Sequence, residues 1–131
     1  MKEAMEEGGI TPLEVDYINA HGTGTPLNDK VETLSIKRVF GQKAYSIPVS
    51  SIKSMVGHCL GSAGSIEAVA SVLSIIHQFI SPTINYQEGD EDCDLDYVPG
   101  KSRGAKVKVV LSNSFAFGGN CTTLVFGKYS A

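Results

Sequence analysis

The sequence predicts an α/β domain in which short strands alternate with helices. Three observations support this fold class. Short runs such as VDYINA at residues 15–20 are rich in strand-forming residues, an apolar run beginning at residue 65 repeats at helical spacing, and loops containing glycine directly follow the strands. The 131 residues are enough for one domain, and 42% hydrophobic with 19% charged residues is a globular balance.

The first third of the chain predicts a helix, a strand and a second helix. Residues 1–7 read as a helix that ends at a glycine pair, although two turns are too few for an independent helix. Residues 15–20 predict a strand, followed by the loop HGTGTP. Asn28 or Asp29 is expected to cap a helix that runs to about residue 40.

The rest of the chain predicts a strand, a core helix and a hairpin. Residues 45–50 form the strand, and the helix from residue 65 is expected to bury its apolar face. Residues 82–104 read mostly as loop, and residues 107–112 and 122–127 as two strands of a hairpin. The apolar residues at helical spacing are Ile66, Val69, Ala70, Leu73, Ile76 and Ile80.

Composition and charge argue against several classes of protein. A net charge of −3 without a basic cluster predicts no nucleic-acid or anionic-membrane partner. Cys59, Cys93 and Cys121 are odd in number and form no CxxC pair, which favours a reducing cytoplasm over a disulfide framework or zinc site. The N-terminus lacks the apolar core of a secretion signal, and residues 66–80 fall short of the roughly 20 residues that cross a bilayer.

Two histidines stand in glycine-containing loops after predicted strands. His21 lies in HGTGTP, and His58 lies in SSIKSMVGHCLGSAGSIEA. Each alone could be a turn histidine bonded to a neighbouring carbonyl, but two in the same setting favour a site. A pair of imidazoles can donate hydrogen bonds to a carbonyl oxygen as it becomes negative. The pattern therefore predicts stabilisation of an oxyanion or enolate.

Charged and aromatic residues near the histidines have a functional and a structural interpretation. Lys53 could pair with Glu67 and hold that ion pair beside the imidazole of His58, or it could be a solvated loop lysine. Glu67 could instead serve the first turn of its helix, where the dipole favours an acid. In NSFAFGGN, Phe117 could open and close a pocket, or pack in a hairpin core as expected for Phe115.

Several other segments look like known functional motifs but do not match the residue spacing that those motifs require. The glycines after His58 form neither GxGxxG nor a phosphate loop, and LGSAG is not a nucleophile elbow. In the acidic run GDEDCDLD, Leu95 stands where a calcium loop needs glycine, so a solvated loop is preferred. His77 lacks a second ligand at metal spacing and is interpreted as structural. No metal site is predicted.

Four motifs resemble one family, in order and over nearly the whole chain. VDYINAHGTGTP, SSIKSMVGHCLGSAGSIE, PTINY with DCDLDYVP, and NSFAFGGN are similar to the carboxyl-terminal half of a β-ketoacyl-acyl-carrier-protein synthase. The resemblance implies a thiolase-like fold, with a mixed sheet and covering helices, over residues 1–131. It also implies an acyltransferase activity, the decarboxylative Claisen condensation of malonyl-carrier protein with an acyl thioester.

The family leaves two pathways open. NDKVET and AYSIPVSSIKSMVGH resemble the ketosynthase subunit of type II polyketide synthases, whereas NSFAFGG resembles the elongation enzymes of fatty-acid biosynthesis. His21, His58 and Lys53 argue against the chain being itself the chain-length-factor subunit, in which such residues are often lost. Ala116 replaces the first glycine of the usual GFGG loop, and NC replaces the common TN that follows it.

The resemblance implies a role for each candidate residue. His21 and His58 would bind the malonyl thioester carbonyl and stabilise the enolate, while Lys53 would organise His58 and pair with Glu67. The remaining roles are tunnel lining by Thr23 and Thr25, support of the HGTGT loop by Asp29 and Glu32, and gating by Phe117.

The resemblance further implies that this chain alone is catalytically incomplete. The family's nucleophilic cysteine belongs to the amino-terminal half, and neither Cys59 nor Cys121 matches its motif. Expected partners are acyl carrier protein, whose phosphopantetheine carries the substrate, and the missing amino-terminal half or a homo- or heterodimeric synthase partner. No cofactor is expected to bind directly. The alternatives are an inactive truncated product and a module that only binds the carrier protein. A half-domain should expose an apolar patch.

Overall fold

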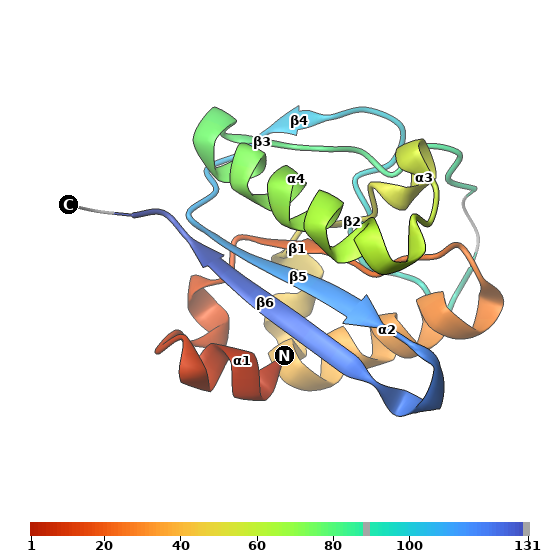
Figure 1. Ribbon diagram of the computed structural model, residues 1–131, viewed down its shortest axis with the longest axis horizontal. Helices are drawn as coiled ribbons and strands as arrows, with labels where there is room; N and C mark the ends of the chain where they lie inside the picture. The colour runs from red at the N-terminus through yellow and green to blue at the C-terminus, as the bar shows by residue number, and fades with distance from the viewer. Residues whose placement is uncertain (88–89, 130–131) are drawn as a thin grey trace.

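The structure is a computed structural model that describes residues 1–87 and 90–129. A four-stranded mixed sheet forms its centre, in the order β2-β1-β5-β6 (Figure 1). Strand β1 pairs in parallel with β2 and β5, and β6 runs antiparallel to β5. The four strands are β1 (Tyr17–Asn19), β2 (Val49–Ser50), β5 (Val109–Phe115) and β6 (Cys121–Gly127).

Helices cover both faces of this sheet, as Figure 1 shows. Helices α1 (Lys2–Glu7) and α2 (Pro26–Phe40) lie on one face, and α4 (Ala63–His77) lies on the other. The short helix α3 (Lys53–Val56) follows β2 directly. A separate ribbon pairs β3 (Phe79–Ile80) with β4 (Arg103–Gly104).

Alternation along the strands divides the core in two. Neighbours such as Tyr17 and Ile18, or Val110 and Leu111, point to opposite faces of the sheet and belong to different apolar clusters. The cluster with Ile18 and Leu111 packs beneath α1 and α2, and the cluster with Tyr17 and Val110 packs beneath α4. Both faces of the central strands are therefore buried.

Several predicted boundaries were wrong by a few residues. Helix α2 begins at Pro26, with Thr25 at the N-cap position, rather than after Asn28 or Asp29. Proline suits the first helical turn because its φ is already helical and it has no N–H that needs a partner. A 3-10 helix over Gly41–Ser46 takes the start of the predicted second strand.

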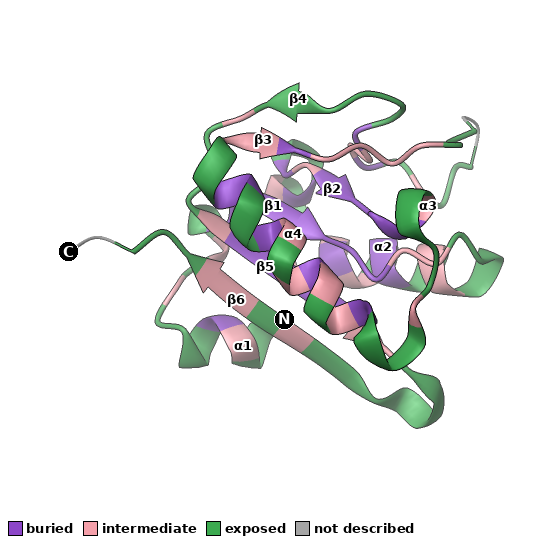
Figure 2. Cartoon of the chain, turned by 45° about the horizontal axis from the view of Figure 1, so that its top comes forward, coloured by how far each residue is buried: buried purple, intermediate pink, exposed green. Residues whose placement is uncertain are grey.

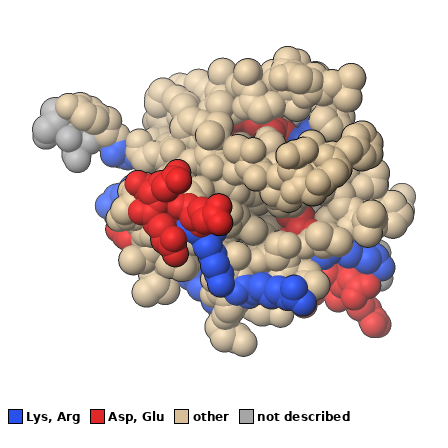
Figure 3. All heavy atoms as spheres, turned by 60° about the horizontal axis from the view of Figure 1, so that its bottom comes forward, with Lys and Arg blue, Asp and Glu red and all other residues tan. Residues whose placement is uncertain are grey.

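The loop predicted at residues 82–104 contains strand β4, which the sequence reasoning missed. Its hydrogen bonds are made to β3, which is distant in sequence. A local sequence pattern therefore does not predict this strand. The acidic run within this loop is largely paired with basic side chains of α2 and β4. These pairs are Lys30 with Asp90 and Asp92, Lys37 with Asp94, and Arg103 with Asp96. On the face shown in Figure 3, acidic and basic side chains lie beside each other.

The prediction for the face of α4 was also wrong. Its apolar side is exposed, with Val69, Leu73 and Ile76 at 60%, 41% and 63% exposure. The side of α4 that faces the sheet is buried (Figure 2) and, apart from Ile75, it carries small or polar residues. Serine and alanine there let the helix approach the sheet closely. The buried residues of α4 are Ala63, Glu67, Ser71, Ser74 and Ile75. An apolar helix face left open in this way is unusual for a complete domain.

The same stretch has the length and composition of a membrane-crossing helix. Within the described residues, Leu60–His77 gives 18 residues of mean hydropathy 1.3, of which 28% are buried. It is longer than the apolar window seen in the sequence because a 3-10 turn over Leu60–Ser62 leads into α4. Core helices of soluble proteins pass the same test.

Candidate active site

The carboxyl ends of β1 and β2 bring the candidate residues together. His21 follows β1 by two residues, Lys53 opens α3 just after β2, and Glu67 lies in the second turn of α4. Adjacent parallel strands end at the same edge of the sheet, so loops far apart in sequence meet there. The prediction that the two histidine loops share one site edge agrees with this geometry.

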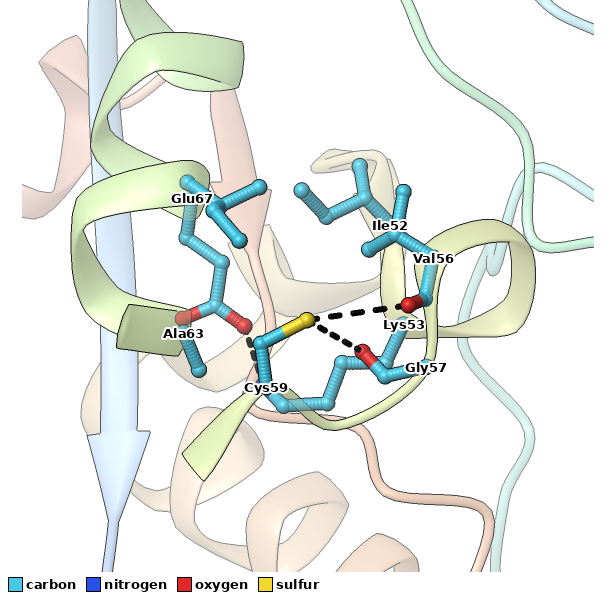
Figure 4. A pocket seen from close by; sticks show the side chains of 8 residues that line it. Ile52, Lys53, Val56, Gly57, Cys59, Ala63 and Glu67 are labelled. Carbon is cyan, nitrogen blue, oxygen red and sulfur yellow. Dashed lines mark hydrogen bonds and ion pairs between the residues drawn. The ribbon is translucent and has the colours of Figure 1, made fainter. Parts of the chain in front are cut away.

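Lys53 and Glu67 form a buried ion pair, as the sequence reasoning anticipated. Their side chains are only 4% and 2% exposed. Figure 4 shows them beside a small hollow that is also lined by Cys59 and Ile52. A buried ion pair of this kind is costly to break from one side, because the remaining charge has no water to solvate it.

The amine of Lys53 contacts His21 and not, as expected, His58. Its Nζ lies 3.4 Å from His21 Nδ1. Because an ammonium has no acceptor, Nδ1 must accept, and the His21 proton therefore resides on Nε2. The expectation that Lys53 organises His58 placed the lysine beside the wrong imidazole. Sequence distance misled it, because α3 turns the lysine back toward β1.

The second histidine is oriented by backbone. The Leu60 N–H donates to His58 Nδ1 at 3.2 Å, which also leaves the proton of a neutral imidazole on Nε2. Leu60 has φ +49°, an uncommon conformation for a residue other than glycine. The His21 and His58 rings lie 5.3 Å apart, nearly perpendicular at 84°. The two imidazoles, each with Nε2 as the nitrogen that carries the proton in its neutral form, therefore lie next to each other in the site.

Burial and charge keep His21 neutral. Burial, followed by the charges of Lys53 and His58, lowers the pKa of His21 to about 4. At pH 7 the His21 imidazole is therefore predominantly neutral. A neutral imidazole with its proton on Nε2 is suited to donating a hydrogen bond but not to supplying a proton.

The HGTGT loop is held by carboxylates at the start of α2. Glu32 accepts the N–H of His21 at 3.0 Å and that of Gly22 at 2.9 Å, and Asp29 accepts the N–H of Gly24 at 3.2 Å. Burial raises the pKa of Glu32, and the hydrogen bonds it accepts oppose that rise. Both acids occupy the positions where their predicted role in supporting this loop requires them.

Glycine at position 22 is dictated by space and by backbone angle. A Cβ there would lie 2.5 Å from the Ser51 Cβ, and φ is +40°. The Ser51 hydroxyl also donates to the Gly22 carbonyl at 2.7 Å. Close approach of the two strand-end loops therefore requires the missing side chain.

The remaining candidates are Thr23, Thr25 and Phe117. Thr23 and Thr25 are joined by a hydroxyl hydrogen bond of 2.9 Å. Phe117 is 99% exposed at the tip of the hairpin, in the 3-10 turn Phe117–Gly119. Phe115, expected in the core, is only half-buried and places its ring 5.7 Å from that of His21.

Two asparagines of the site were not found from the sequence. Asn19 donates to the Glu67 carbonyl at 3.1 Å and to Ser71 Oγ at 3.3 Å, which fixes the start of α4 against β1. Asn113 donates to Glu32 at 3.1 Å. For Asn19, a polar residue inside a predicted strand is the signal that could have revealed its role, because a buried amide needs partners. Asn113 gave no such signal, because the predicted strand ended at residue 112, whereas β5 continues to Phe115.

The described residues include two buried oxygens without a hydrogen-bond partner, Asn19 Oδ1 and Glu67 Oε2. Among residues 1–87 and 90–129, no group of three or more His, Cys, Asp or Glu side chains is placed to hold a metal ion. Cys59, Cys93 and Cys121 are all free thiols.

Comparison with known proteins defines the class. Residues 1–87 match the model for the beta-ketoacyl synthase, C-terminal domain. The 3-oxoacyl-[acyl-carrier-protein] synthase 2 of Synechocystis sp. is 56% identical over 126 residues, covering 96% of this chain and 30% of that protein. The tetracenomycin polyketide synthase ketoacyl synthase alpha subunit of Streptomyces glaucescens is 53% identical over 116 residues, covering 88% and 27%. The chain belongs to the beta-ketoacyl synthase family.

A solved structure supports the same assignment. A type II polyketide synthase ketosynthase, in complex with its acyl-carrier protein, matches with a TM-score of 0.96 and 43% identity over 98% of this chain and 32% of that one. The predicted thiolase-like α/β fold is thus confirmed. The chain spans about a third of the length of the curated relatives that it matches.

Proposed function

We propose that residues 1–131 are the carboxyl-terminal domain of a 3-oxoacyl-[acyl-carrier-protein] synthase and supply the groups that activate malonyl-carrier protein. The observation that carries this proposal is the pair of imidazoles 5.3 Å apart, each with Nδ1 occupied as an acceptor. We propose that the two Nε2–H groups serve one carbonyl oxygen, which accepts a hydrogen bond from each.

In the proposed reaction, the malonyl thioester carbonyl lies between His21 and His58. The bond to the malonyl carboxylate breaks, carbon dioxide leaves, and the electron pair moves into an enolate whose oxygen accepts both hydrogen bonds. The enolate carbon then attacks the acyl thioester on a cysteine of the amino-terminal part. A carbon–carbon bond forms, and the cysteine thiolate leaves. Neither imidazole has to transfer a proton, which agrees with the low pKa of His21.

The other residues are proposed to support these donors. Lys53, held by Glu67, keeps the Nδ1 of His21 an acceptor and its ring neutral. In addition, Thr23 and Thr25 line the tunnel for phosphopantetheine, Asp29 and Glu32 hold the loop, and Phe117 is the gate. No cofactor is proposed to bind directly, because acyl carrier protein brings the substrate on its phosphopantetheine.

Two observations support the proposed partners: the curated relatives are about three times as long as this chain, and the apolar side of α4 is exposed. Helix α4, which carries Glu67 on its buried side, exposes an apolar side, and about two thirds of each curated relative lies outside the matched region. Covering Val69, Leu73 and Ile76 with the amino-terminal part, or with a homo- or heterodimeric synthase partner, would remove this surface from water. The solved relative bound to acyl-carrier protein supports that carrier as the second partner. We place the protein in the cytoplasm.

A ketosynthase subunit of a type II polyketide synthase is the second candidate. Two observations favour it, the 53% identity to the tetracenomycin subunit and the TM-score of 0.96 to a type II ketosynthase. The acyl pocket decides between the pathways, and its wall is expected mostly in the amino-terminal part. An inactive fragment or a module that only binds the carrier is the remaining alternative.

The test is an assay of decarboxylation and condensation with malonyl-carrier protein. It is run on this chain alone and after addition of the cysteine-bearing amino-terminal part of a family member. Activity only in the mixture is expected. His21→Ala and His58→Ala should each lower decarboxylation at least 100-fold. The control is His77→Ala, which changes an exposed histidine at the far end of α4. Silence in both preparations, or full activity of both histidine variants, would refute the proposal.

A further inference from the structure

The β5–β6 hairpin reaches the His21 loop at two points. Asn113 and Phe115 stand two residues apart on β5 and so project from the same face. Phe115 lies against the His21 ring at 5.7 Å, and Asn113 reaches Glu32, which holds the His21 backbone. The same hairpin carries Phe117 at its tip. The hairpin therefore contacts His21 directly through Phe115 and indirectly through Asn113 and Glu32.

The amide of Asn113 is fully satisfied in one orientation. Its Nδ2 donates to Glu32 Oε1 at 3.1 Å and lies 3.7 Å from the Met1 sulfur. Its Oδ1 accepts the hydroxyl of Thr123 at 2.9 Å, and Thr123 is its cross-strand neighbour on β6. The residue is completely buried. A hydroxyl donor on Oδ1 therefore selects the orientation in which the NH₂ group faces the carboxylate.

Glu32 transmits that contact to the catalytic loop. The oxygen that accepts from Asn113, Oε1, also accepts the His21 N–H, and Oε2 accepts the Gly22 N–H. Glu32 is 2% exposed, so water cannot replace a lost donor without opening the site. A fourth, longer hydrogen bond of 3.4 Å comes from the Asn28 amide to Oε2. The position of the carboxylate, and with it the path of the backbone at His21, depends on these four donors.

We propose that Asn113, oriented by Thr123, is a positioning residue that couples the hairpin bearing Phe117 to His21. The proposal rests on the proposed function of His21 and deepens it. Asn113 touches no substrate and acts through Glu32. Movement of β5 against β6 at this pair releases the Glu32 carboxylate and loosens the His21 and Gly22 amides together. Phe117 cannot then move independently of the enolate-stabilising group.

Amide hydrogen exchange, followed by NMR on this chain, tests the coupling. Thr123→Val removes the donor to Asn113 while keeping shape, and Thr123→Ser restores it. The control is Thr122→Val, an exposed neighbour on the same strand. Thr123→Val should speed exchange at the His21 and Gly22 amides at least 10-fold relative to the Ile18 amide. Ile18 N–H is bonded to the Pro48 carbonyl within the sheet, and it reports opening of the fold.

Each outcome decides the matter. Faster exchange at His21 and Gly22 alone, reversed in Thr123→Ser, supports the coupling. Equally faster exchange at the Ile18 amide means that the Thr123 hydroxyl only stabilises the fold as a whole. That result overturns the proposed coupling. Unchanged exchange at all three amides also overturns it. The threonine variants are milder than Asn113→Ala, which removes a completely buried amide and would also lower the stability of the whole fold.

A second readout separates this proposal from the proposed function. In the mixture with the amino-terminal part, Thr123→Val should slow malonyl decarboxylation about 10-fold and leave acyl transfer to the cysteine unchanged. If His21→Ala leaves decarboxylation intact, the proposed function fails, whereas the exchange result stands by itself. If the rates of decarboxylation and acyl transfer fall equally in Thr123→Val, Asn113 has no positioning role specific to His21. The proposed role of His21 in stabilising the enolate is not affected by that result.

Discussion

Removing the charge of Lys53 should destabilise the chain more than any change to an exposed lysine. Lys53→Met leaves the Glu67 carboxylate 2% exposed, with Oε2 already lacking a partner among the described residues. Breaking a buried pair from one side costs about 3–5 kcal/mol in the free energy of unfolding. Since small domains have about 5–15 kcal/mol in total, the variant should be marginally folded.

Urea unfolding followed by circular dichroism measures this cost. The double variant Lys53→Met with Glu67→Leu removes both charges, and it should recover at least about 2 kcal/mol of the loss. Lys106→Met, which changes an exposed lysine, should stay within about 0.5 kcal/mol of the parent chain. Equal losses for Lys53→Met and Lys106→Met, or losses that simply add in the double variant, would refute the buried pair.

Three further predictions concern pH, backbone and surface. An NMR titration of the His21 imidazole should give a pKa of about 4, and Lys53→Met should raise this pKa, because the Lys53 charge adds to burial in lowering it. Because folded His21 binds its proton more weakly than the unfolded chain does, stability should fall as the pH drops from about 6.5 to about 4; a pH-independent urea midpoint over that window would contradict this. Gly22→Ala should cost more than about 2 kcal/mol, whereas Gly24→Ala, with open space around its Cβ, should cost only about 1 kcal/mol of backbone strain; equal costs would show that crowding is unimportant. Because the apolar side of α4 is exposed, the chain should self-associate with rising concentration in sedimentation, and Val69→Glu should reduce this association and weaken complementation by the amino-terminal part; unchanged association in Val69→Glu would show that another surface drives it.

Much of the fold could be predicted because local patterns suffice for it. The helix closed by Gly8, the strand before His21 and the hairpin of β5 and β6 all appear close to where residue periodicity and glycines place them. Strand β4 did not appear in the prediction, because its two residues become a strand only through pairing with β3. Periodicity also assigned the wrong face of α4 to the core. The pattern marks an apolar side, but it does not say which protein segment buries it.

The sequence predicted which residues form the candidate site more accurately than it predicted the contacts among them. His21, His58, Lys53 and Glu67 all lie together. The partner of Lys53 was misassigned, since five residues along the chain suggested His58 and the turn of α3 brings His21 closer. Their proposed roles remain predictions until the variants are assayed.

The sequence by itself determined the residue types of the site and the loops that hold them. Histidine, lysine and glycine are chemically distinctive, and their local spacing predicts loops at strand ends. Only the tertiary structure decided the tautomers of His21 and His58, the burial of Glu32 and the link from Asn113 to His21. Those properties depend on contacts between segments up to about ninety residues apart, and hydrogen-bond direction and desolvation arise only when such segments meet.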